Sequence, residues 1–292
     1  MIAPAQQVSH GQLKSFPKFS SEHIGERTIA VWLPENYTSE QSYPTLYMHD
    51  GQMLFDAKTT WNGQEWGIDE VAHRLIQQGD VPPFIVVGIW NAGPLRHSEY
   101  FPQKPFELLK ESARDSILEY SKRGKEALFK KPIQSDAYLK FLTQELKPFI
   151  DKNFATRPGP ENTFLMGSSM GGLISWYALC EYPDIFGGAA CMSTHWPGGF
   201  VYEDNPIPDS FIDYLDKNLP PPAKHRLYFD LGDATLDANY PPLQQKVDLL
   251  MTKKGYSSTL WTTRFFPGEN HSEEAWNKRL HEPLIFLFNP KK

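Results

Sequence analysis

The second half of the chain alternates short apolar runs with amphipathic segments, and this alternation limits the possible folds more than any other feature. The runs typical of strands, rich in β-branched, aromatic and other apolar residues, are 163–166, 186–192, 226–231 and 259–265. The segments with helical spacing of apolar residues are 137–154, 171–180, 242–253 and 272–288. Strands that alternate with helices predict an α/β fold, with a mostly parallel central sheet covered by helices on both faces.

The first half continues the pattern and adds one irregular stretch. Strands are predicted at 28–33, 45–48 and 84–90, and a helix at 68–76. Residues 103–135 are rich in Lys, Glu and Arg and poor in apolar residues, which predicts a surface excursion with some helix. This excursion could be a lid over a site, or a surface segment that does not cover any site. Without repeats or linkers, residues 1–292 are interpreted as a single domain with a lid-like insertion around 103–135.

Composition excludes several classes of protein. The net charge of −6 argues against nucleic acid as a partner, because binding to phosphates needs clustered cations. Two cysteines, Cys180 and Cys191, are too few for a disulfide scaffold and are expected to be free, buried thiols. No apolar stretch approaches the ~18 residues of a membrane span. The first residues lack the pattern of a signal peptide, so a cytoplasmic location is expected, although a leader that had been removed would leave no trace.

The sequence Gly-Ser-Ser-Met-Gly at 167–171 matches the G-x-S-x-G pattern, with Ser169 at its centre. A strand is predicted before it and a helix after it, which is the context that holds a serine in a strained, exposed turn. Flanking glycines suit such a turn because a Cβ atom would clash as the chain reverses. A Gly/Ser-rich helix entry without a catalytic role is the alternative. The flanking elements favour Ser169, rather than its neighbour Ser168, as a nucleophile.

A general base and an acid should follow in the chain order Ser, acid, His, as in α/β-hydrolases. His271 lies on a predicted loop after the last strand and is the candidate base. His195, after the strand 186–192, is the competitor as base and a candidate for lining the pocket. The acid should follow the strand 226–231, and the spacing leaves three candidates open: Asp230, Asp233 and Asp237.

An acyl-transfer site also needs amide donors for a developing oxyanion. The amide of Met170, directly after the candidate nucleophile, is one. The second is expected in the loop after the strand 45–48, where Gly51 would let the backbone turn the amide of Gln52 toward the site. An ordinary Asp-Gly turn is the alternative interpretation of this loop.

Taken together, several motifs resemble the esterase D-like putative esterase family, which includes feruloyl and acetylxylan esterases, siderophore-ester hydrolases and mycolyl transferases. The resemblance covers roughly residues 15–288 and rests on the segments 47–52, 67–70, 96–100, 138–142, 145–148, 167–172 and 271–276. It implies an α/β-hydrolase fold with Ser169 and His271 in the site. A Gly-x-x-x-Leu-Asp stretch at 232–237 implies Asp237 as the acid, while the additional Asp233 keeps that choice open. The place of Gln52 after Asp-Gly matches the oxyanion position of the family.

The expected function is therefore a serine carboxylic-ester hydrolase that works through an acyl-serine intermediate. Its partner would be a small ester with a short acyl chain or a carbohydrate or phenolic group, and no metal or other cofactor is expected. An acyltransferase with the same residues and a non-catalytic carbohydrate-binding relative are the alternatives. Trp66, His195 and Trp196 are the candidate pocket residues, since rings at loops or strand ends could stack on sugars or phenolics.

Overall fold

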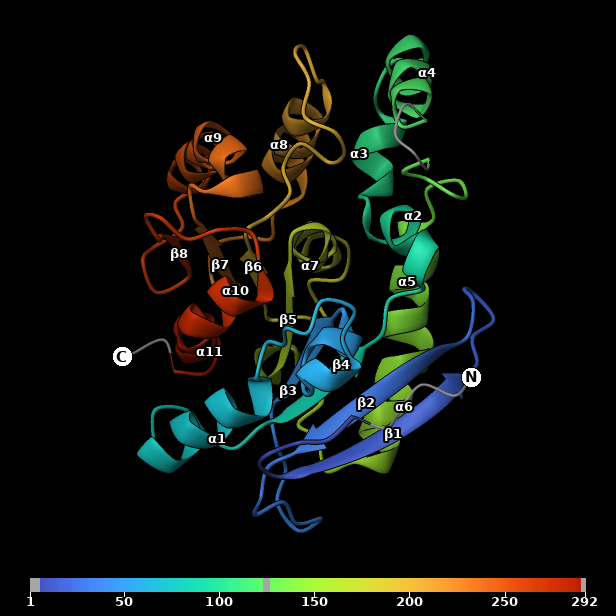
Figure 1. Cartoon of the computed structure of the whole chain (residues 1–292). Coiled ribbons are helices and arrows are strands. Elements are labelled where there is room, and N and C mark those ends of the chain that lie inside the picture. The colour runs from blue at the N-terminus through green and yellow to red at the C-terminus, as the bar shows by residue number, and fades with distance from the viewer. Residues whose placement is uncertain (1–5, 123–126, 290–292) are drawn as a thin grey trace.

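A computed structural model describes residues 6–122 and 127–289. The described residues form an eight-stranded sheet that runs through the molecule (Figure 1). Its order is β1-β2-β4-β3-β5-β6-β7-β8. The strands are β1 (Gln12–Phe19), β2 (Arg27–Leu33), β3 (Thr45–His49), β4 (Ile85–Ile89), β5 (Thr163–Ser168), β6 (Gly188–Met192), β7 (Arg226–Leu231) and β8 (Trp261–Phe265). All neighbours from β4 to β8 are parallel, and β1 and β2 form an antiparallel edge. The predicted α/β fold with a mostly parallel sheet is confirmed.

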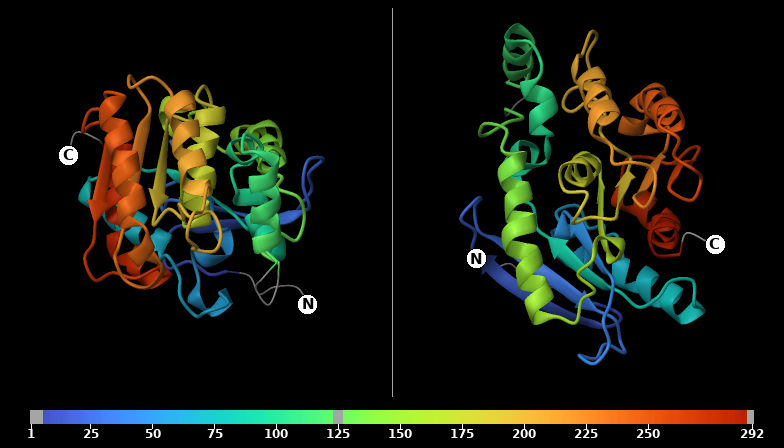
Figure 2. Two further views of the ribbon diagram at one scale, coloured as in Figure 1. Left: turned by 90° about the horizontal axis from the view of Figure 1, so that it is seen from above. Right: turned by 180° about the vertical axis from the view of Figure 1, so that it is seen from behind.

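Helices cover both faces of the sheet because its strands are apolar on both sides. In β4, Val87 points into one core and Val86 into the other. The first core is closed by α5 (Ser135–Lys140), α6 (Lys147–Asn153), α7 (Met170–Glu181), α8 (Ile207–Asn218) and α9 (Pro241–Lys253). The second is closed by α1 (Ile68–Gln78), α10 (Glu273–Arg279) and α11 (His281–Phe288). Figure 2 shows α1 on the opposite side of the sheet from α7–α9.

Proline explains where two predicted helices are interrupted. The helix expected at 272–288 is two helices, since Pro283 has no N–H to donate to the carbonyl of Arg279, where α10 ends. The helix expected at 137–154 begins at Ser135 and passes through a π-helical turn, Phe141–Leu146, just before Pro148. The two cysteines are buried and free, as expected.

Three elements outside the insertion were not predicted, namely β1, the short helix α2 (Arg96–Tyr100) and α8. The edge strand β1 was not predicted because its sequence lacks the apolar alternation of an inner strand. It is largely exposed, and its register is broken between Phe16 and Phe19. The helix α8 follows a stretch rich in Gly and Pro that gives no helical signal of its own.

The insertion around 103–135 contributes α3 (Gln103–Glu107) and α4 (Glu111–Tyr120), after the short helix α2 (Arg96–Tyr100). Figure 1 shows α4 at the far end of the molecule, beyond α2 and α3, and α3 packs against α8. Residues 123–126 of the insertion lie outside the described residues. Within the described ranges, no helix has both the length and the apolar character that a bilayer crossing requires.

Candidate active site

The nucleophile candidate lies in a tight turn between β5 and α7. Ser169 has φ 58° and ψ −120°, a conformation that side-chain-bearing residues rarely adopt. A Cβ atom on Gly167 would lie 2.7 Å from the carbonyl carbon of Gly171, so only glycine permits this approach. The turn is held by hydrogen bonds from the Ser169 amide to the carbonyl of Met192 (2.9 Å) and from the His195 amide to the carbonyl of Ser169 (3.2 Å). The strand, turn and helix around Ser169 thus match the predicted arrangement.

Of the three acids, the structure brings Asp237 against His271. His271 Nδ1 lies 2.6 Å from Asp237 Oδ1, although the residues are 34 positions apart. Asp233 instead accepts a hydrogen bond from the Gly268 amide (2.7 Å). Asp230 is buried in an ion pair with Arg279 (3.0 Å). Only Asp237 is therefore placed to orient the imidazole.

Asp237 is fully buried, and its second oxygen is also satisfied. Oδ2 accepts hydrogen bonds from Ser193 Oγ (2.6 Å) and from the Gly232 amide (2.7 Å). Burial by itself would raise the pKa of Asp237, but the hydrogen bonds from His271, Ser193 and Gly232 outweigh it and lower the pKa below its usual range. The carboxylate is therefore ionised and can stabilise a positive charge on His271.

Ser193 is a supporting residue that sequence reasoning missed. It follows β6 with φ 40°, and its hydroxyl accepts hydrogen bonds from Trp276 Nε1 (3.0 Å) and Arg279 (2.8 Å). Since both of these partners can only donate, the hydroxyl proton must go to Asp237. The signal that could have found Ser193 is its position at the carboxyl end of a parallel strand, where sites form.

Tyr240 is a second residue that the sequence did not reveal. Its hydroxyl lies 2.7 Å from His195 Nδ1, and the Nε2–H of His195 donates to the carbonyl of Gly199 (2.6 Å). Burial lowers the pKa of His195 to about 3, so this imidazole is neutral and its Nδ1 accepts the proton of Tyr240. Among the described residues, no hydrogen bond joins Ser169 to His271 in this state of the site.

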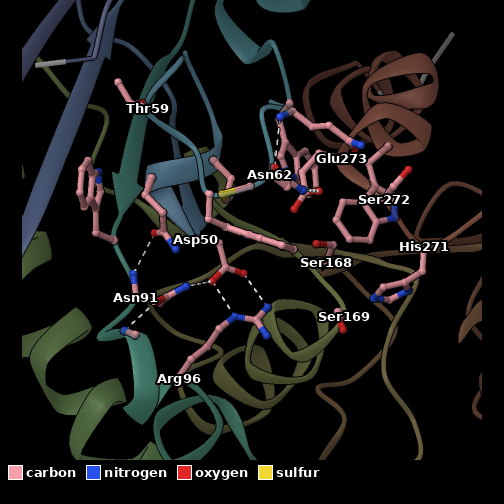
Figure 3. A pocket seen from close by; sticks show the side chains of 18 residues that line it. Asp50, Thr59, Asn62, Asn91, Arg96, Ser168, Ser169, His271, Ser272 and Glu273 are labelled. Carbon is pink, nitrogen blue, oxygen red and sulfur yellow. Dashed lines mark hydrogen bonds and ion pairs between the residues drawn. The ribbon is translucent and has the colours of Figure 1, made fainter. Parts of the chain in front are cut away.

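Ser169 and His271 open into a cavity of about 810 Å³ (Figure 3). Aromatic and polar side chains share its lining. The lining residues are Asp50, Gln52, Met53, Thr59, Trp61, Asn62, Gln64, Trp66, Trp90, Asn91, Gly93, Arg96, Ser168, Ser169, His271, Ser272, Glu273 and Trp276. None of these belongs to the insertion around 103–135, so its described residues do not cover the cavity.

The three candidate pocket residues lie in different places in the structure. Trp66 lines the cavity, whereas the lining residues that the structure describes do not include His195 or Trp196. Trp196 is 1% exposed and donates its indole N–H to Gln244 (2.9 Å). The chain after β6 turns inward, so His195 supports Tyr240 from behind and Trp196 packs in the core on Trp176.

Of the two predicted oxyanion residues, Met170 directly follows Ser169, and Gln52 lines the same cavity. Met170 is the first residue of α7, where backbone amides have no partner within the helix. Gln52 lines the cavity from a 3-10 turn, Gly51–Met53. The left-handed residue of this turn is Asp50 (φ 58°) rather than Gly51, which corrects the expected role of the glycine. Gly51 is needed because a Cβ atom there would lie 2.6 Å from the backbone of Gly88.

The loop that carries Gln52 is held by an ion pair. Arg96 makes two hydrogen bonds to the carboxylate of Asp50, both 2.7 Å, and Asn91 makes a third at 2.6 Å (Figure 3). Burial opposes ionisation of Asp50, but the charge and hydrogen bonds of Arg96 outweigh it and lower the pKa of Asp50. The loop is thereby held in place by contacts within the protein, which is what a preorganised oxyanion site would require.

The described residues also hold one cluster with the composition of a metal site, His10, Glu35 and His73. None of the three lines the cavity at Ser169.

Comparison with known proteins gives consistent results. The model of the family described as "Putative esterase" matches residues 20–287. "Uncharacterized protein YbbA" of Bacillus subtilis (strain 168) is 27% identical over 280 residues, which are 93% of this chain and 97% of that protein. "Endo-1,4-beta-xylanase/feruloyl esterase" of Xylanibacter ruminicola is 27% identical over 227 residues, 74% of this chain but only 26% of that protein.

A solved structure shows the same fold. The IroE-like serine hydrolase from Shewanella oneidensis superposes with a TM-score of 0.70 at 19% identity. The match covers 95% of this chain and 80% of that one.

Proposed function

This chain belongs to the Putative esterase family, which makes it a carboxylesterase-type hydrolase, and we propose that it works through an acyl-serine intermediate on Ser169. The observation that carries the proposal is the pairing of His271 with the buried, ionised Asp237 at the cavity into which Ser169 opens. A base oriented by an acid, beside a serine in a strained turn, is the arrangement that activates a hydroxyl for acyl transfer.

In the proposed reaction, Ser169 Oγ attacks the ester carbonyl carbon while His271 Nε2 accepts its proton. The negative charge that develops on the carbonyl oxygen is stabilised by the amides of Met170 and Gln52. When the tetrahedral intermediate collapses, the bond to the alkoxy oxygen breaks and His271 returns the proton to the leaving alcohol. Water, activated by the same histidine, then attacks the acyl-serine and releases the acid.

The hydroxyl of Ser169 must move for this reaction. Since no hydrogen bond joins Ser169 to His271 here, Oγ and the imidazole have to come closer, and a rotation about the Cα–Cβ bond of Ser169 is the simplest motion that could do so (Figure 3). Such a rotation between staggered positions is a normal motion of a serine side chain. Hydrogen bonds of this kind commonly tighten only once substrate is bound.

The lining of the cavity supports an ester whose acyl or alcohol part carries an aromatic ring or hydroxyl groups. The exposed ring of Trp61 and the partly buried ring of Trp90 offer faces for stacking, and Asn62 and Gln64 offer hydrogen-bonding groups in the lining. We therefore propose phenolic or carbohydrate esters, or short-chain acyl esters, as the substrate class. The feruloyl esterase of Xylanibacter ruminicola, by its name, acts on an ester of this kind.

The proposal is tested with purified protein and a panel of esters. Acyl chains from acetyl to decanoyl on one chromogenic alcohol, together with methyl ferulate, would define the preferred acyl group. Ser169→Ala should remove turnover of every active ester, by a factor on the order of 10⁴–10⁶, and should abolish labelling by a fluorophosphonate. Ser168→Ala is the matched control and should still be labelled. Full turnover by Ser169→Ala would refute the assignment.

A further inference from the structure

A segment that precedes β1 lies against the loop that carries Gln52. The side-chain NH₂ group of Gln6 donates hydrogen bonds to the carbonyl of Gln52 (3.1 Å) and to the carbonyl of Gly51 (3.4 Å). The residues joined in this way are 46 and 45 positions apart, so only the tertiary structure brings them together. Gln6 is partly buried, and the described lining of the cavity does not include it. Its contact with the site therefore runs through this loop.

The contact with Gly51 bears on the direction of the amide that is proposed to stabilise the oxyanion. The carbonyl of Gly51 and the N–H of Gln52 belong to one peptide group, and in a trans peptide they point in opposite directions. No cis peptide bond occurs among the described residues. A donor bound at the Gly51 carbonyl thus leaves the N–H of Gln52 pointing away from Gln6.

This peptide is open to a flip because the residue that precedes it is a glycine. A flip changes ψ of Gly51 and φ of Gln52, and glycine resists such a change less than any other residue. After a flip, the N–H of Gln52 would face the NH₂ group of Gln6, so two donors would meet. The carbonyl of Gly51 would also lose its partner. Gln6 therefore favours one of the two orientations of the peptide.

The ion pair at Asp50 holds a different part of the loop. Arg96 binds the carboxylate of Asp50, one residue before the peptide. The backbone amide of Asn91 donates to the side-chain oxygen of Gln52 (3.1 Å). Both contacts are made to side chains, whereas Gln6 binds backbone carbonyls. The contribution of Gln6 is therefore distinct from that of the ion pair.

The backbone next to Gln6 is itself fastened at two places. The amide of Gln7 donates to the carboxylate of Asp56 (3.1 Å). The amide of Ser9 donates to the fully buried Asp69 (2.7 Å), and the hydroxyl of Ser9 donates to Glu70 (2.7 Å). Because these contacts order the backbone of the segment, only the side chain of Gln6 has to lose freedom when it binds the loop.

We propose that Gln6 is a positioning residue for ester hydrolysis, which holds the peptide between Gly51 and Gln52 so that the N–H of Gln52 is directed at the oxyanion. This role rests on the proposed function, since it concerns an amide that acts in that reaction. The charge on the carbonyl oxygen of the ester develops in the transition state. Loss of this restraint should therefore lower kcat and leave KM nearly unchanged.

The main test replaces Gln6 by Glu, which has nearly the same shape but presents an oxygen where the NH₂ group lies. A carboxylate cannot donate to the two carbonyls and repels them. In Gln6→Glu, kcat for the best ester should fall about tenfold, which is less than the roughly 10²–10³-fold that loss of an oxyanion donor costs. Labelling by a fluorophosphonate should slow by a similar factor, because its phosphonyl oxygen needs the same donors. Gln6→Lys restores a donor and should keep kcat within about threefold of the wild type.

Gln7→Glu is the matched control. It places the same charge one residue away, where the side chain is exposed and the contact with Asp56 is made by the backbone amide. This variant should keep the wild-type kcat and labelling rate. Circular dichroism and urea midpoints should show that all three variants are folded. The pH dependence of kcat should keep its shape, since His271 and Asp237 are not touched.

The role of Gln6 is refuted if Gln6→Glu is labelled and hydrolyses esters at wild-type rates, if Gln7→Glu is equally impaired, or if Gln6→Lys loses as much as Gln6→Glu. A loss in KM rather than kcat, or a displaced pH profile, also refutes it, because Gln6 would then act on binding or on His271. Failure of the proposed function looks different: wild-type Ser169 is not labelled and Ser169→Ala keeps its turnover, and the role of Gln6 then falls with it.

Discussion

Replacing Asp237 by Asn tests the proposed site most sharply, because the surroundings of this side chain dictate how the amide must sit. Asp237 accepts hydrogen bonds on both oxygens: His271 Nδ1 lies at Oδ1, and the amide of Gly232 and the hydroxyl of Ser193 lie at Oδ2. The Gly232 amide can only donate, so the remaining carbonyl oxygen of Asn has to face it. The NH₂ group of Asn then faces His271.

An NH₂ group at Nδ1 forces the wrong tautomer on the imidazole. Nδ1 becomes the acceptor and Nε2 carries the proton, so His271 can no longer accept the proton of Ser169. The reverse orientation would place NH₂ against the Gly232 N–H and leave a buried donor unsatisfied, at a cost of about 1–3 kcal/mol. In a comparable site the loss of the acid lowers kcat about 10⁴-fold. At about 1.4 kcal/mol for each factor of ten, this is about 5 kcal/mol of transition-state stabilisation.

The assay is steady-state hydrolysis of the best ester from the panel, with unfolding followed in parallel to confirm that Asp237→Asn is folded. Asp233→Asn is the matched control. Asp233 accepts only the Gly268 amide on an exposed loop, so this variant should keep wild-type kcat and lose at most about 1 kcal/mol of stability. The reasoning is refuted if Asp237→Asn keeps more than about a tenth of kcat, or if Asp233→Asn is as impaired.

Three further predictions concern the turn, the pH dependence and the rim. Gly167→Ala should destabilise the protein by about 1–3 kcal/mol and lower kcat about 100-fold, because the added Cβ atom would lie 2.7 Å from the backbone of Gly171. Chemical unfolding measures the loss of stability, and steady-state kinetics measures the loss of kcat. Burial and the neighbouring Glu70 raise the pKa of Asp69 to about 7, so the folded state binds more protons than the unfolded state above pH ~4. Stability should therefore fall as the pH rises from ~4 to ~7, and urea midpoints of Asp69→Asn should show a smaller fall. Trp61, 83% exposed at the rim, should affect binding alone: Trp61→Ala should raise KM several-fold for an aromatic ester at unchanged kcat, and an equal loss of kcat would count against stacking.

Local sequence was sufficient for the parts of the site that depend on local structure. Ser169 could be proposed as the nucleophile because the glycines around it, a strand before it and a helix after it all act within a few residues. His271 could be proposed as the base because the order of strands along the chain limits where a base can lie. The inner strands β3 to β7 were predictable for a similar reason, since burial on both faces requires a nearly continuous apolar run.

The residues that only the tertiary structure decided are those whose role depends on how distant loops meet. The choice of Asp237 over Asp233 rests on the loops after β7 and β8, which place a side chain 34 residues away against His271. His195 and Trp196 follow a strand end just as the motif residue Ser169 does. The chain there turns into the core, so His195 contacts Tyr240 and Trp196 is buried, and neither residue is among the lining of the cavity.

The amino-acid sequence by itself therefore indicated most of the order of strands and helices and the proposed nucleophile and base of this protein, because these follow from short-range sterics and from hydrophobic periodicity. The tertiary structure alone decided which acid orients His271, that Ser193 and Tyr240 support the site, and that His10, Glu35 and His73 meet. Contacts between residues tens of positions apart depend on the packing of the whole sheet and its loops, and no local pattern encodes them.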